Sequence, residues 1–340
     1  MNSLNYIGSK YSLYPVLKPH FEKIINGFNR SVVFGDLFAG TGIIGYNIGT
    51  EFGAKIIAND IQYYSYVINK ANLSVYTDDD INHINILVKQ LNKLKGIQGF
   101  IYKNYSKNEE CERMYFSNEN AMKIDAIREK LKKERKKMSE NVYYYLLANL
   151  ISSADKVANT SCVYGAYLKT LKKSATKMLT MNGINNETKQ VNVTGEVFCE
   201  NVSNIQTPRL DIVYLDPPYN NRQYAPNYHI LETIALADNP EIHGKTGLRD
   251  YSSQKSDFCI KKLVSKRMEE LISTLDTLFI LISYNDEGLI PKEEFIKMLN
   301  RYGKLEIIEI DYRKFKAQKN VDRNETIEYL FVLEKIHTEI

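Results

Sequence analysis

The turn Asp216-Pro217-Pro218-Tyr219 holds the residues of this sequence that are best suited to chemistry. It follows the apolar run 211–215 directly, and two prolines cannot continue a central strand because each lacks a backbone N–H. The chain must therefore leave the sheet here, which exposes the Asp216 carboxylate and the Pro217 carbonyl as adjacent acceptors beside the Tyr219 ring. Such a set suits a planar base with an exocyclic amino group. A strand-ending turn with a solvent-facing Asp is the alternative for this motif taken alone.

A glycine-containing turn follows another short apolar run, 32–37, and comprises Phe38, Ala39, Gly40, Thr41 and Gly42. Glycines allow a sharp turn and a close approach of the backbone to a ligand. The helix expected after the turn offers free N–H groups to an anionic group such as a carboxylate. The full GxGxxG and GxxxxGK spacings are missing, which disfavours a nucleoside triphosphate. A turn that only packs a strand on a helix is the alternative.

Asp60 stands at the tip of a second predicted strand, 54–58. A carboxylate at this position can accept both hydroxyls of a ribose, as in adenosine-type cofactors. Aspartate is also favoured as the N-cap of a helix, and a helical stretch begins near Tyr63. Both interpretations of Asp60 stay open when the residue is taken alone.

These turns must be positioned by a sheet, since two strand-then-helix units between residues 32 and 73 are typical of a parallel Rossmann-type sheet. We therefore predict an α/β fold, with a catalytic domain formed by residues 1–75 and 191–340 and a mainly helical insertion at 76–190. The remaining strands are predicted at 196–199, 211–215 and 277–282, with a closing antiparallel pair at 305–310 and 326–333.

Charge is distributed unevenly along this 340-residue chain, whose net charge is only +4. The insertion contains 20 Lys and Arg against 13 Asp and Glu, a net of +7, so the remainder carries −3. This asymmetry favours a polyanion as partner of the insertion, whereas a solvated helix face is the alternative. Within it, Lys169, Lys172 and Lys173 adjoin the polar, aromatic stretch 159–168. That stretch is either a DNA-reading surface or the junction between domains. We favour the first, because Lys169 and Lys172 would be neighbours on a helix.

Other compositional features narrow the protein class. The four cysteines are far apart and form no CxxC pair, and the five histidines are scattered, so we predict neither a metal site nor a disulfide framework. No run approaches the roughly 18 apolar residues of a membrane span, and the N-terminus has no apolar signal core. We therefore predict a cytoplasmic protein without membrane contact.

Taken together, these motifs resemble the S-adenosylmethionine-dependent DNA adenine N6-methyltransferases of the α class, typified by the Dam group. The resemblance covers most of the chain. Residues 5–11 match the N-terminal cofactor motif of that family, 38–42 its FxGxG motif, Asp60 its ribose-binding acid and 216–219 its DPPY motif. The fold implied is a Rossmann-like class I methyltransferase sheet with an inserted, mainly helical target-recognition domain.

The resemblance also implies individual roles. Tyr6 and Lys10 would flank the methionine part of the cofactor, where the Dam group usually has Trp in place of Tyr6, and Asp36 would take its amino group. Asn201 stands where the family has an Asp that holds the cofactor adenine, with Glu200 as the alternative contact. Three residues just past DPPY would line the target pocket or meet the DNA backbone, or are merely polar surface residues: Arg222, Gln223 and Tyr224.

The function implied is site-specific methylation of a flipped adenine in double-stranded DNA, with S-adenosylmethionine as cofactor. The resemblance further suggests a restriction-modification system whose cognate restriction endonuclease is a separate protein. Methylation of RNA or of a protein glutamine amide is the nearest alternative, because an xPPY pocket accepts any planar amino group. A non-catalytic subunit that binds S-adenosylmethionine or nucleic acid is the alternative from another class, which the intact acid at Asp216 disfavours.

Overall fold

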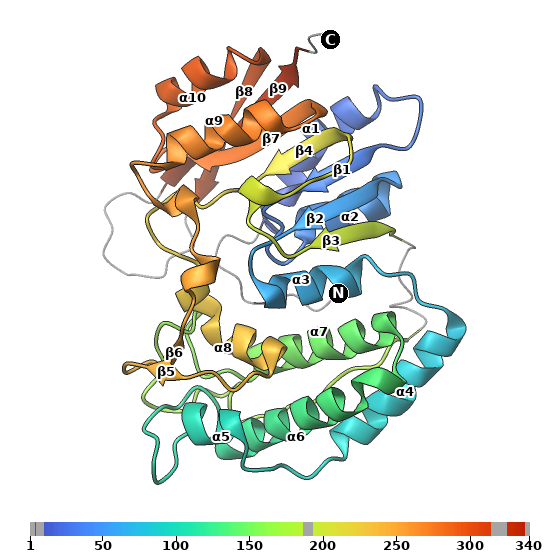
Figure 1. Cartoon of the computed structure of the whole chain (residues 1–340), viewed down its shortest axis with the longest axis vertical. Coiled ribbons are helices and arrows are strands. Elements are labelled where there is room, and N and C mark those ends of the chain that lie inside the picture. Colours follow the sequence, from blue (N-terminus) through green and yellow to red (C-terminus); the bar gives the residue numbers. More distant parts are fainter. Residues whose placement is uncertain (1–3, 5–9, 186–192, 314–324, 337–340) are drawn as a thin grey trace.

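A seven-stranded sheet forms the centre of one half of the molecule (Figure 1). The computed structural model describes residue 4 and residues 10–185, 193–313 and 325–336. The strand order is β3-β2-β1-β4-β7-β9-β8; the first five strands are parallel, and β9 is antiparallel to both β7 and β8. The strands are β1 (Val33–Asp36), β2 (Lys55–Asn59), β3 (Gly195–Phe198), β4 (Leu210–Leu215), β7 (Thr277–Asn285), β8 (Gly303–Arg313) and β9 (Glu325–Lys335).

All seven predicted strands are present, which confirms the α/β fold with its mostly parallel sheet. The chain moves outwards from β1 through β2 to β3, then returns to place β4 on the other side of β1. The order therefore reverses between β1 and β4. In open parallel sheets, ligands bind outside the carboxyl ends of the strands at such a reversal.

Helices cover both faces of the sheet. The cluster on one face joins α1 (Tyr14–Ile25) and α2 (Ile43–Phe52) to strand residues such as Phe34 and Ile212. The cluster on the other face joins α9 (Val264–Thr274) and α10 (Lys292–Leu299) to residues such as Val213. Because successive strand residues alternate between the two faces, neighbouring apolar residues in β4 enter different cores.

A helical lobe forms the other half of the molecule (Figure 1). Its core also includes α3 residues such as Tyr64 and Val67, so α3 (Tyr63–Asn72) joins the sheet to the lobe. The lobe is not built from residues 76–190 alone, because α8, which follows the DPPY turn, packs in the same core through Ile230 and Ile234. Its elements are α4 (Asp78–Asn92), α5 (Phe100–Tyr105), α6 (Asn118–Glu134), η1 (Arg135–Lys137), α7 (Glu140–Lys156), α8 (Ala225–Leu236), β5 (Ile242–His243) and β6 (Leu248–Arg249).

Residues 157–185 form turns and irregular backbone, so the prediction of a helix that carries both Lys169 and Lys172 was wrong. Lys169 and Lys172 are therefore not neighbours on a helix. Asparagine side chains instead form hydrogen bonds with the backbone N–H and C=O groups of this segment. Asn159 Nδ2 donates to the carbonyls of Met114 and Leu168 at 2.9 and 3.0 Å, and its Oδ1 accepts the Lys172 N–H at 2.9 Å.

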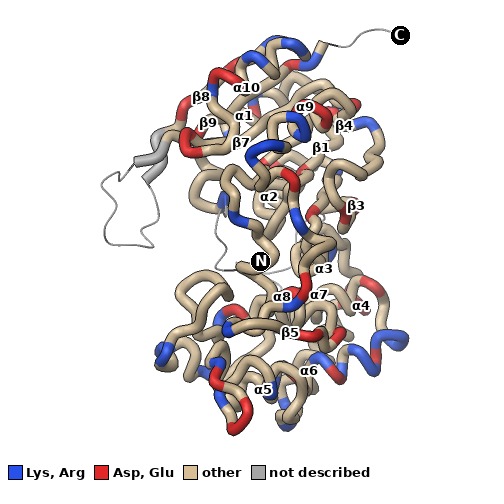
Figure 2. Tube along the Cα trace, turned by 60° about the vertical axis from the view of Figure 1, so that its left-hand side comes forward, with Lys and Arg blue, Asp and Glu red and all other residues tan. Residues whose placement is uncertain are grey.

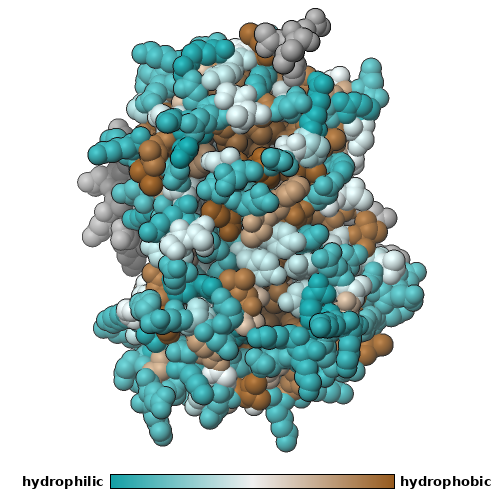
Figure 3. All heavy atoms as spheres, in the orientation of Figure 1, coloured by the Kyte–Doolittle hydropathy of each residue, from teal (hydrophilic) through white to brown (hydrophobic). Residues whose placement is uncertain are grey.

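Charged residues of both signs lie on the sheet half and on the helical lobe (Figure 2). The face seen in Figure 3 is mainly hydrophilic, with smaller hydrophobic patches between the polar residues. Among the described residues, no helix combines the length and apolar character that crossing a membrane requires. Three short 3-10 helices complete the fold: η2 (Val202–Asn204), η3 (Ser252–Gln254) and η4 (Asp257–Cys259).

Candidate active site

A hollow of about 950 Å³, including its open mouth, lies at the carboxyl ends of β1, β2 and β4. It is the position expected from the reversal of strand order. The lining brings together ten residues singled out in the sequence: Lys10, Asp36, Phe38, Ala39, Gly40, Thr41, Asp60, Asn201, Asp216 and Pro218. Gln223, Tyr224 and Glu200 also line it. Residues more than 200 positions apart in the chain therefore meet at one site.

The glycine turn after β1 has a backbone that other residues rarely adopt. Gly40 and Gly42 have φ values of 52° and 76°. A Cβ atom on Gly42 would lie 2.2 Å from Asn69 Oδ1, so a side chain cannot be accommodated there. Asn69 Nδ2 in turn donates to the Gly40 carbonyl at 3.0 Å. The turn is thus held against α3 and begins α2, for which Gly42 is the N-cap.

Two carboxylates line the hollow, the buried Asp36 and the half-buried Asp60. Asp36 Oδ2 accepts the Gly45 N–H at 3.0 Å, and burial raises the pKa of Asp36 to about 7. Asp60 accepts the Gln62 and Gly40 N–H groups, both at 2.8 Å. Burial raises the pKa of Asp60 to about 6, although these hydrogen bonds oppose the shift. A bound cation would lower the pKa of both acids, because a nearby positive charge favours the ionised form.

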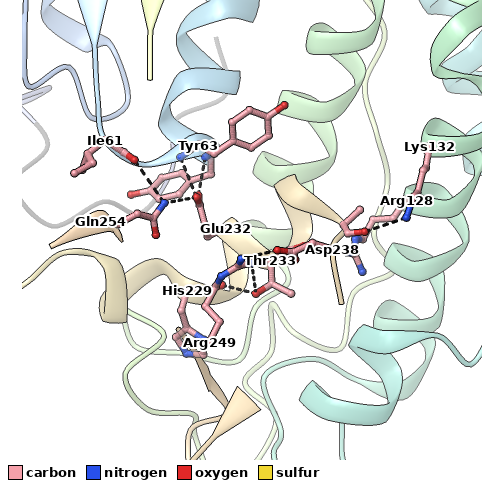
Figure 4. A network of polar contacts seen from close by, with 12 residues as sticks. Ile61, Tyr63, Arg128, Lys132, His229, Glu232, Thr233, Asp238, Arg249 and Gln254 are labelled. Carbon is pink, nitrogen blue, oxygen red and sulfur yellow. Dashed lines mark hydrogen bonds and ion pairs between the residues drawn. The ribbon is translucent and has the colours of Figure 1, made fainter. Parts of the chain in front are cut away.

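Asp60 is not the N-cap of α3, so that alternative was wrong: Gln62 occupies the cap position. Glu232 on α8 caps this helix from outside, since its carboxylate accepts the N–H groups of Tyr63 and Tyr64 at 3.0 and 2.8 Å (Figure 4). Gln254 Nε2 donates to Glu232 Oε1 at 2.5 Å. A carboxylate at a helix N-terminus is favoured by the helix dipole.

Asp216, directly after β4, faces the ammonium of Lys10. Lys10 Nζ lies 3.0 Å from Asp216 Oδ1 and 2.8 Å from Glu328 Oε1 on β9. Burial raises the pKa of Asp216 to about 6, against the lowering effect of Lys10 and with the support of Glu328. Burial alone would lower the pKa of Lys10, but Asp216 and Glu328 together raise it well above its usual value. The ammonium therefore stays charged.

The aromatic residues near Asp216 occupy two positions. Tyr224 lines the hollow, whereas Tyr219 does not. The half-buried Tyr219 ring packs against the cluster that contains Leu215 and Phe258. Burial raises the pKa of Tyr219, and Lys10 and Asp216 act on it electrostatically, so the ring is close to both. Pro217 is buried and does not line the hollow.

Asn201 lines the hollow, but its side chain also serves the local backbone. Asn201 Oδ1 accepts the Ser203 N–H at 3.0 Å and caps η2. Glu200 lines the same wall, and its backbone N–H and carbonyl are both bonded to the Asn59 side chain. Each residue therefore stays a candidate for the cofactor contact predicted at this point.

The remaining predicted residues lie outside the lining. Arg222 is exposed, and its backbone N–H is bonded to Asn220 Oδ1 at 2.9 Å. Lys169 and Lys173 are exposed on the irregular segment, whereas Lys172 Nζ donates to the Thr160 carbonyl at 2.7 Å. Tyr6 lies outside the residues that the structure describes.

Four residues of this region were missed in the sequence: Gln62, Glu232, Gln254 and Glu328. Glu232 had a signal, because it interrupts an otherwise apolar helical run and an acid there predicts a buried, partnered charge. Glu328 had none, since an acid within an alternating strand is expected to face solvent. Gln62 and Gln254 are ordinary polar residues of loops and helix ends.

The lining fits the cofactor that the resemblance implies. Besides the phenols of Tyr214 and Tyr224, the ionisable groups that the described residues place in the lining are one ammonium and four carboxyl groups, of Asp36, Asp60, Glu200 and Asp216. An excess of carboxylates suits a ligand that bears a sulfonium and an amino group and disfavours phosphates. Gln62 Oε1 is buried in this wall and has no hydrogen-bond partner among the described residues, so it offers a ligand donor an open acceptor.

Comparison with known proteins identifies a family. The model of the D12 class N6 adenine-specific DNA methyltransferases matches residues 6–298. The type II methyltransferase M.NlaIII of Neisseria lactamica is 42% identical over 98% of this chain and 99% of its own length. M.CviAII of Paramecium bursaria Chlorella virus 1 is 38% identical over 97% of this chain and 98% of its own. M.FokI of Planomicrobium okeanokoites is also 38% identical, and this chain covers 53% of its length.

Proposed function

We propose residue roles from one premise: this chain belongs to the D12 class of N6 adenine-specific DNA methyltransferases, for which S-adenosylmethionine is the methyl donor. In this proposal, Asp216 and the Pro217 carbonyl accept the two amino hydrogens of one adenine. The observation that carries it is the shared hollow, where Asp216 follows β4 next to the glycine turn of β1 and the acid of β2.

The cofactor contacts come from the first two strand ends. Asp36 takes the amino group of the methionine part, together with Lys10 and Tyr6 at its flank. Asp60 takes the ribose hydroxyls, and Asn201 or Glu200 takes the adenine. The turn from Phe38 to Gly42, with Ala39, Gly40 and Thr41, would hold the methionine part, and the N–H groups at the start of α2 would favour its carboxylate. Bound S-adenosylmethionine supplies a methyl group that is already activated by a sulfonium leaving group.

The protein's contribution to the reaction is to orient the adenine amino group. The adenine amino group is a poor nucleophile because its lone pair is delocalised into the ring. Asp216 and the Pro217 carbonyl, by accepting both amino hydrogens, direct that lone pair towards the methyl carbon. Positioning and preorganised acceptors of this kind supply most of the acceleration in such a direct displacement. Pro218 fixes the turn so that both oxygens keep their places.

The adenine reaches this site by leaving the duplex. Flipping a nucleotide costs a few kcal/mol, and stacking on an aromatic ring returns about 1–3 kcal/mol per base. Tyr219 is the proposed stacking ring. Tyr224, which lines the hollow, is the second aromatic contact. Arg222, exposed two residues earlier, meets the DNA backbone.

The helical lobe is the proposed target-recognition domain. Its described part comprises residues 76–185 of the predicted insertion 76–190, and its core is completed by α8 and the β5–β6 hairpin from the catalytic segment. Lys169, Lys172 and Lys173 contact DNA phosphates in this proposal. The net charge of +7 on residues 76–190 supports this assignment, because phosphate contacts dominate DNA affinity.

The type II relatives suggest the biological setting. We infer that this enzyme modifies one DNA sequence in a restriction-modification system, in the cytoplasm. A cognate restriction endonuclease is the proposed partner, as a separate protein.

The test is methyl transfer from labelled donor to separate DNA, RNA and protein substrates. We expect label in double-stranded DNA only, as N6-methyladenine at one recurring sequence. Sequencing the modified bases of DNA from cells that express the chain identifies the site. Label in RNA or in a glutamine side chain would instead support the alternative substrate, and no label with retained cofactor binding would support a non-catalytic subunit.

A further inference from the structure

Glu328 on β9 forms a charged cluster with Lys10 and Asp216. The Lys10 ammonium lies within 3.0 Å of both carboxylates, and the exposed fractions of the three side chains are 11% for Lys10, 19% for Asp216 and 10% for Glu328. One buried cation is therefore shared by two anions. One of these anions is the residue proposed above to hold the substrate amine.

We propose that Glu328 is a positioning residue that draws Lys10 away from Asp216 when the target amino group arrives. This inference rests on the function proposed above. An amino hydrogen needs a lone pair on the Asp216 carboxylate, and the Lys10 ammonium competes for the same oxygens. Glu328 gives the ammonium a second counter-ion, so Lys10 moves without leaving a buried charge unpaired.

The strand register supplies a further acceptor beside Glu328. Asn285 of β7 stands directly opposite Glu328 in the antiparallel pairing, and residues so paired share one face of the sheet. Asn285 is buried, and its Oδ1 has no hydrogen-bond partner among the described residues. An ammonium has three donors. If the Lys10 ammonium moves towards Glu328, it therefore meets two acceptors, the Glu328 carboxylate and the Asn285 carboxamide oxygen.

The two neighbours act on Asp216 in opposite directions. Beside the larger effect of burial, Lys10 lowers the pKa of Asp216 and Glu328 raises it. Other titratable groups that interact with Asp216 are Asp36 at the end of β1, Tyr214 on β4, and Tyr219 and Tyr224 after β4. Glu328 also raises the pKa values of Tyr214 and Tyr219, but burial raises both as well, so these phenols stay neutral around neutral pH with or without Glu328. Without the Glu328 charge, Lys10 pairs with Asp216 alone. The pKa of Asp216 then falls, and its carboxylate becomes a weaker hydrogen-bond acceptor.

The decisive variant is Glu328→Gln, which keeps the shape and removes the charge. We expect kcat for DNA methylation to fall about tenfold, while KM for S-adenosylmethionine changes less than about twofold. The acid limb of the kcat–pH profile should move to lower pH, a shift that loss of packing alone does not produce. In a Lys10→Met background, Glu328→Gln should cause little further loss of kcat, because no ammonium is left to be drawn away and only the direct effect of Glu328 on the pKa of Asp216 remains.

The matched control is Glu309→Gln on the neighbouring strand β8, where Glu309 pairs with Lys292 away from Asp216. It should leave kcat and the pH profile unchanged. Wild-type kcat in Glu328→Gln, or a fall in kcat with an unmoved acid limb, would overturn the role of Glu328. Asp216→Ala distinguishes failure of the Glu328 proposal from failure of the proposed function. If Asp216→Ala is inactive, the proposed function stands even when Glu328 proves dispensable. If Asp216→Ala is active, the proposed function itself is wrong.

Discussion

Glu232 and Asp216 are both carboxylates with little exposed surface, but their surroundings differ. Glu232 accepts three N–H donors, from Tyr63, Tyr64 and Gln254, and is 1% exposed. Asp216 lines the hollow and is paired with one lysine that it shares with Glu328. The lone pairs of Glu232 are thus committed to fixed donors, whereas a substrate donor can still compete for those of Asp216.

This contrast separates structural acids from reactive ones. Glu232 connects the halves of the molecule, because α8 also holds the helical lobe: the Thr233 carbonyl accepts Arg128 Nη2 at 3.0 Å (Figure 4). Arg249 of β6 pairs with Asp238 just past α8, with Nη2 2.6 Å from Oδ2. Removing Glu232 should therefore affect folding, and removing Asp216 should affect chemistry.

The largest effect is expected for Asp216→Ala. Loss of the proposed carboxylate acceptor should reduce kcat by roughly a thousandfold or more, since it acts at the reacting amino group. Affinity for S-adenosylmethionine should remain within severalfold of wild type, as measured by calorimetry. The exposed Asp250→Ala serves as control and should retain full activity. Substantial turnover by Asp216→Ala would show that Asp216 is not the reactive acid in this comparison with Glu232.

Glu232→Ala should destabilise the fold by about 2–4 kcal/mol, because two helix N–H groups and one amide lose their acceptor. Chemical denaturation measures this loss. Once corrected for the folded fraction, kcat should match that of wild type. Glu241→Ala, at an 87% exposed side chain past α8, is the matched control and should not change stability. An unchanged free energy of unfolding for Glu232→Ala would contradict its structural role.

The raised pKa values of Asp36 and Asp60 predict that stability and cofactor affinity change in opposite directions with pH. Burial raises their pKa values to about 7 and about 6, so the protonated forms favour the folded, ligand-free protein. Their contribution to stability is complete below pH 4 and is lost as the pH rises through 6 and 7. A cationic cofactor favours the ionised forms, so its affinity should fall up to about tenfold per pH unit below 7.

Thermal unfolding from pH 5.5 to 8, with and without S-adenosylmethionine, measures both effects. The increase in Tm caused by the cofactor should grow with pH. Asp36→Asn should weaken binding at pH 8 and remove the part of the pH dependence centred near 7. A cofactor-induced shift that is equal at all pH values would mean that neither carboxylate contacts a cationic group.

The strand ends could be predicted from the sequence because their signals are local. Two prolines end β4 at Asp216, and Gly40 and Gly42 form the turn after β1. Each signal depends on residues within a few positions. The carboxyl ends of parallel strands share one edge of a sheet, so local turns were sufficient to predict that these residues would meet.

The residues that were missed depend on partners far along the chain. Glu232 caps a helix that begins 169 residues earlier, and Glu328 pairs with Lys10 across 318 residues. The irregular backbone of 157–185 is likewise held by asparagines of α4, α6 and α7, such as Asn120, which bonds Ala175, Lys177 and Leu179. No pattern within that segment reports such partners, and the spacing of Lys169 and Lys172 was read as that of neighbours on a helix.

The smallest effect concerns the irregular segment and DNA. Lys169 and Lys173 are exposed, whereas Lys172 Nζ is bonded to the Thr160 carbonyl. Replacing Lys169 and Lys173 by Gln should weaken DNA binding and reduce the salt slope by about two, one for each lost phosphate contact. Adding Lys172→Gln should reduce the slope less than either of the other two, because its ammonium already has a fixed acceptor.

Lys55→Gln is the control for this comparison. Lys55 begins β2, at the opposite end of the strand from the hollow, and pairs with Glu196 on the edge strand. Its loss should leave the salt slope unchanged, since a duplex that delivers adenine to Asp216 cannot also contact the amino ends of the strands. If the double lysine variant keeps the wild-type slope, the phosphate contacts lie on other basic residues of the helical lobe, and 157–185 is a junction between domains.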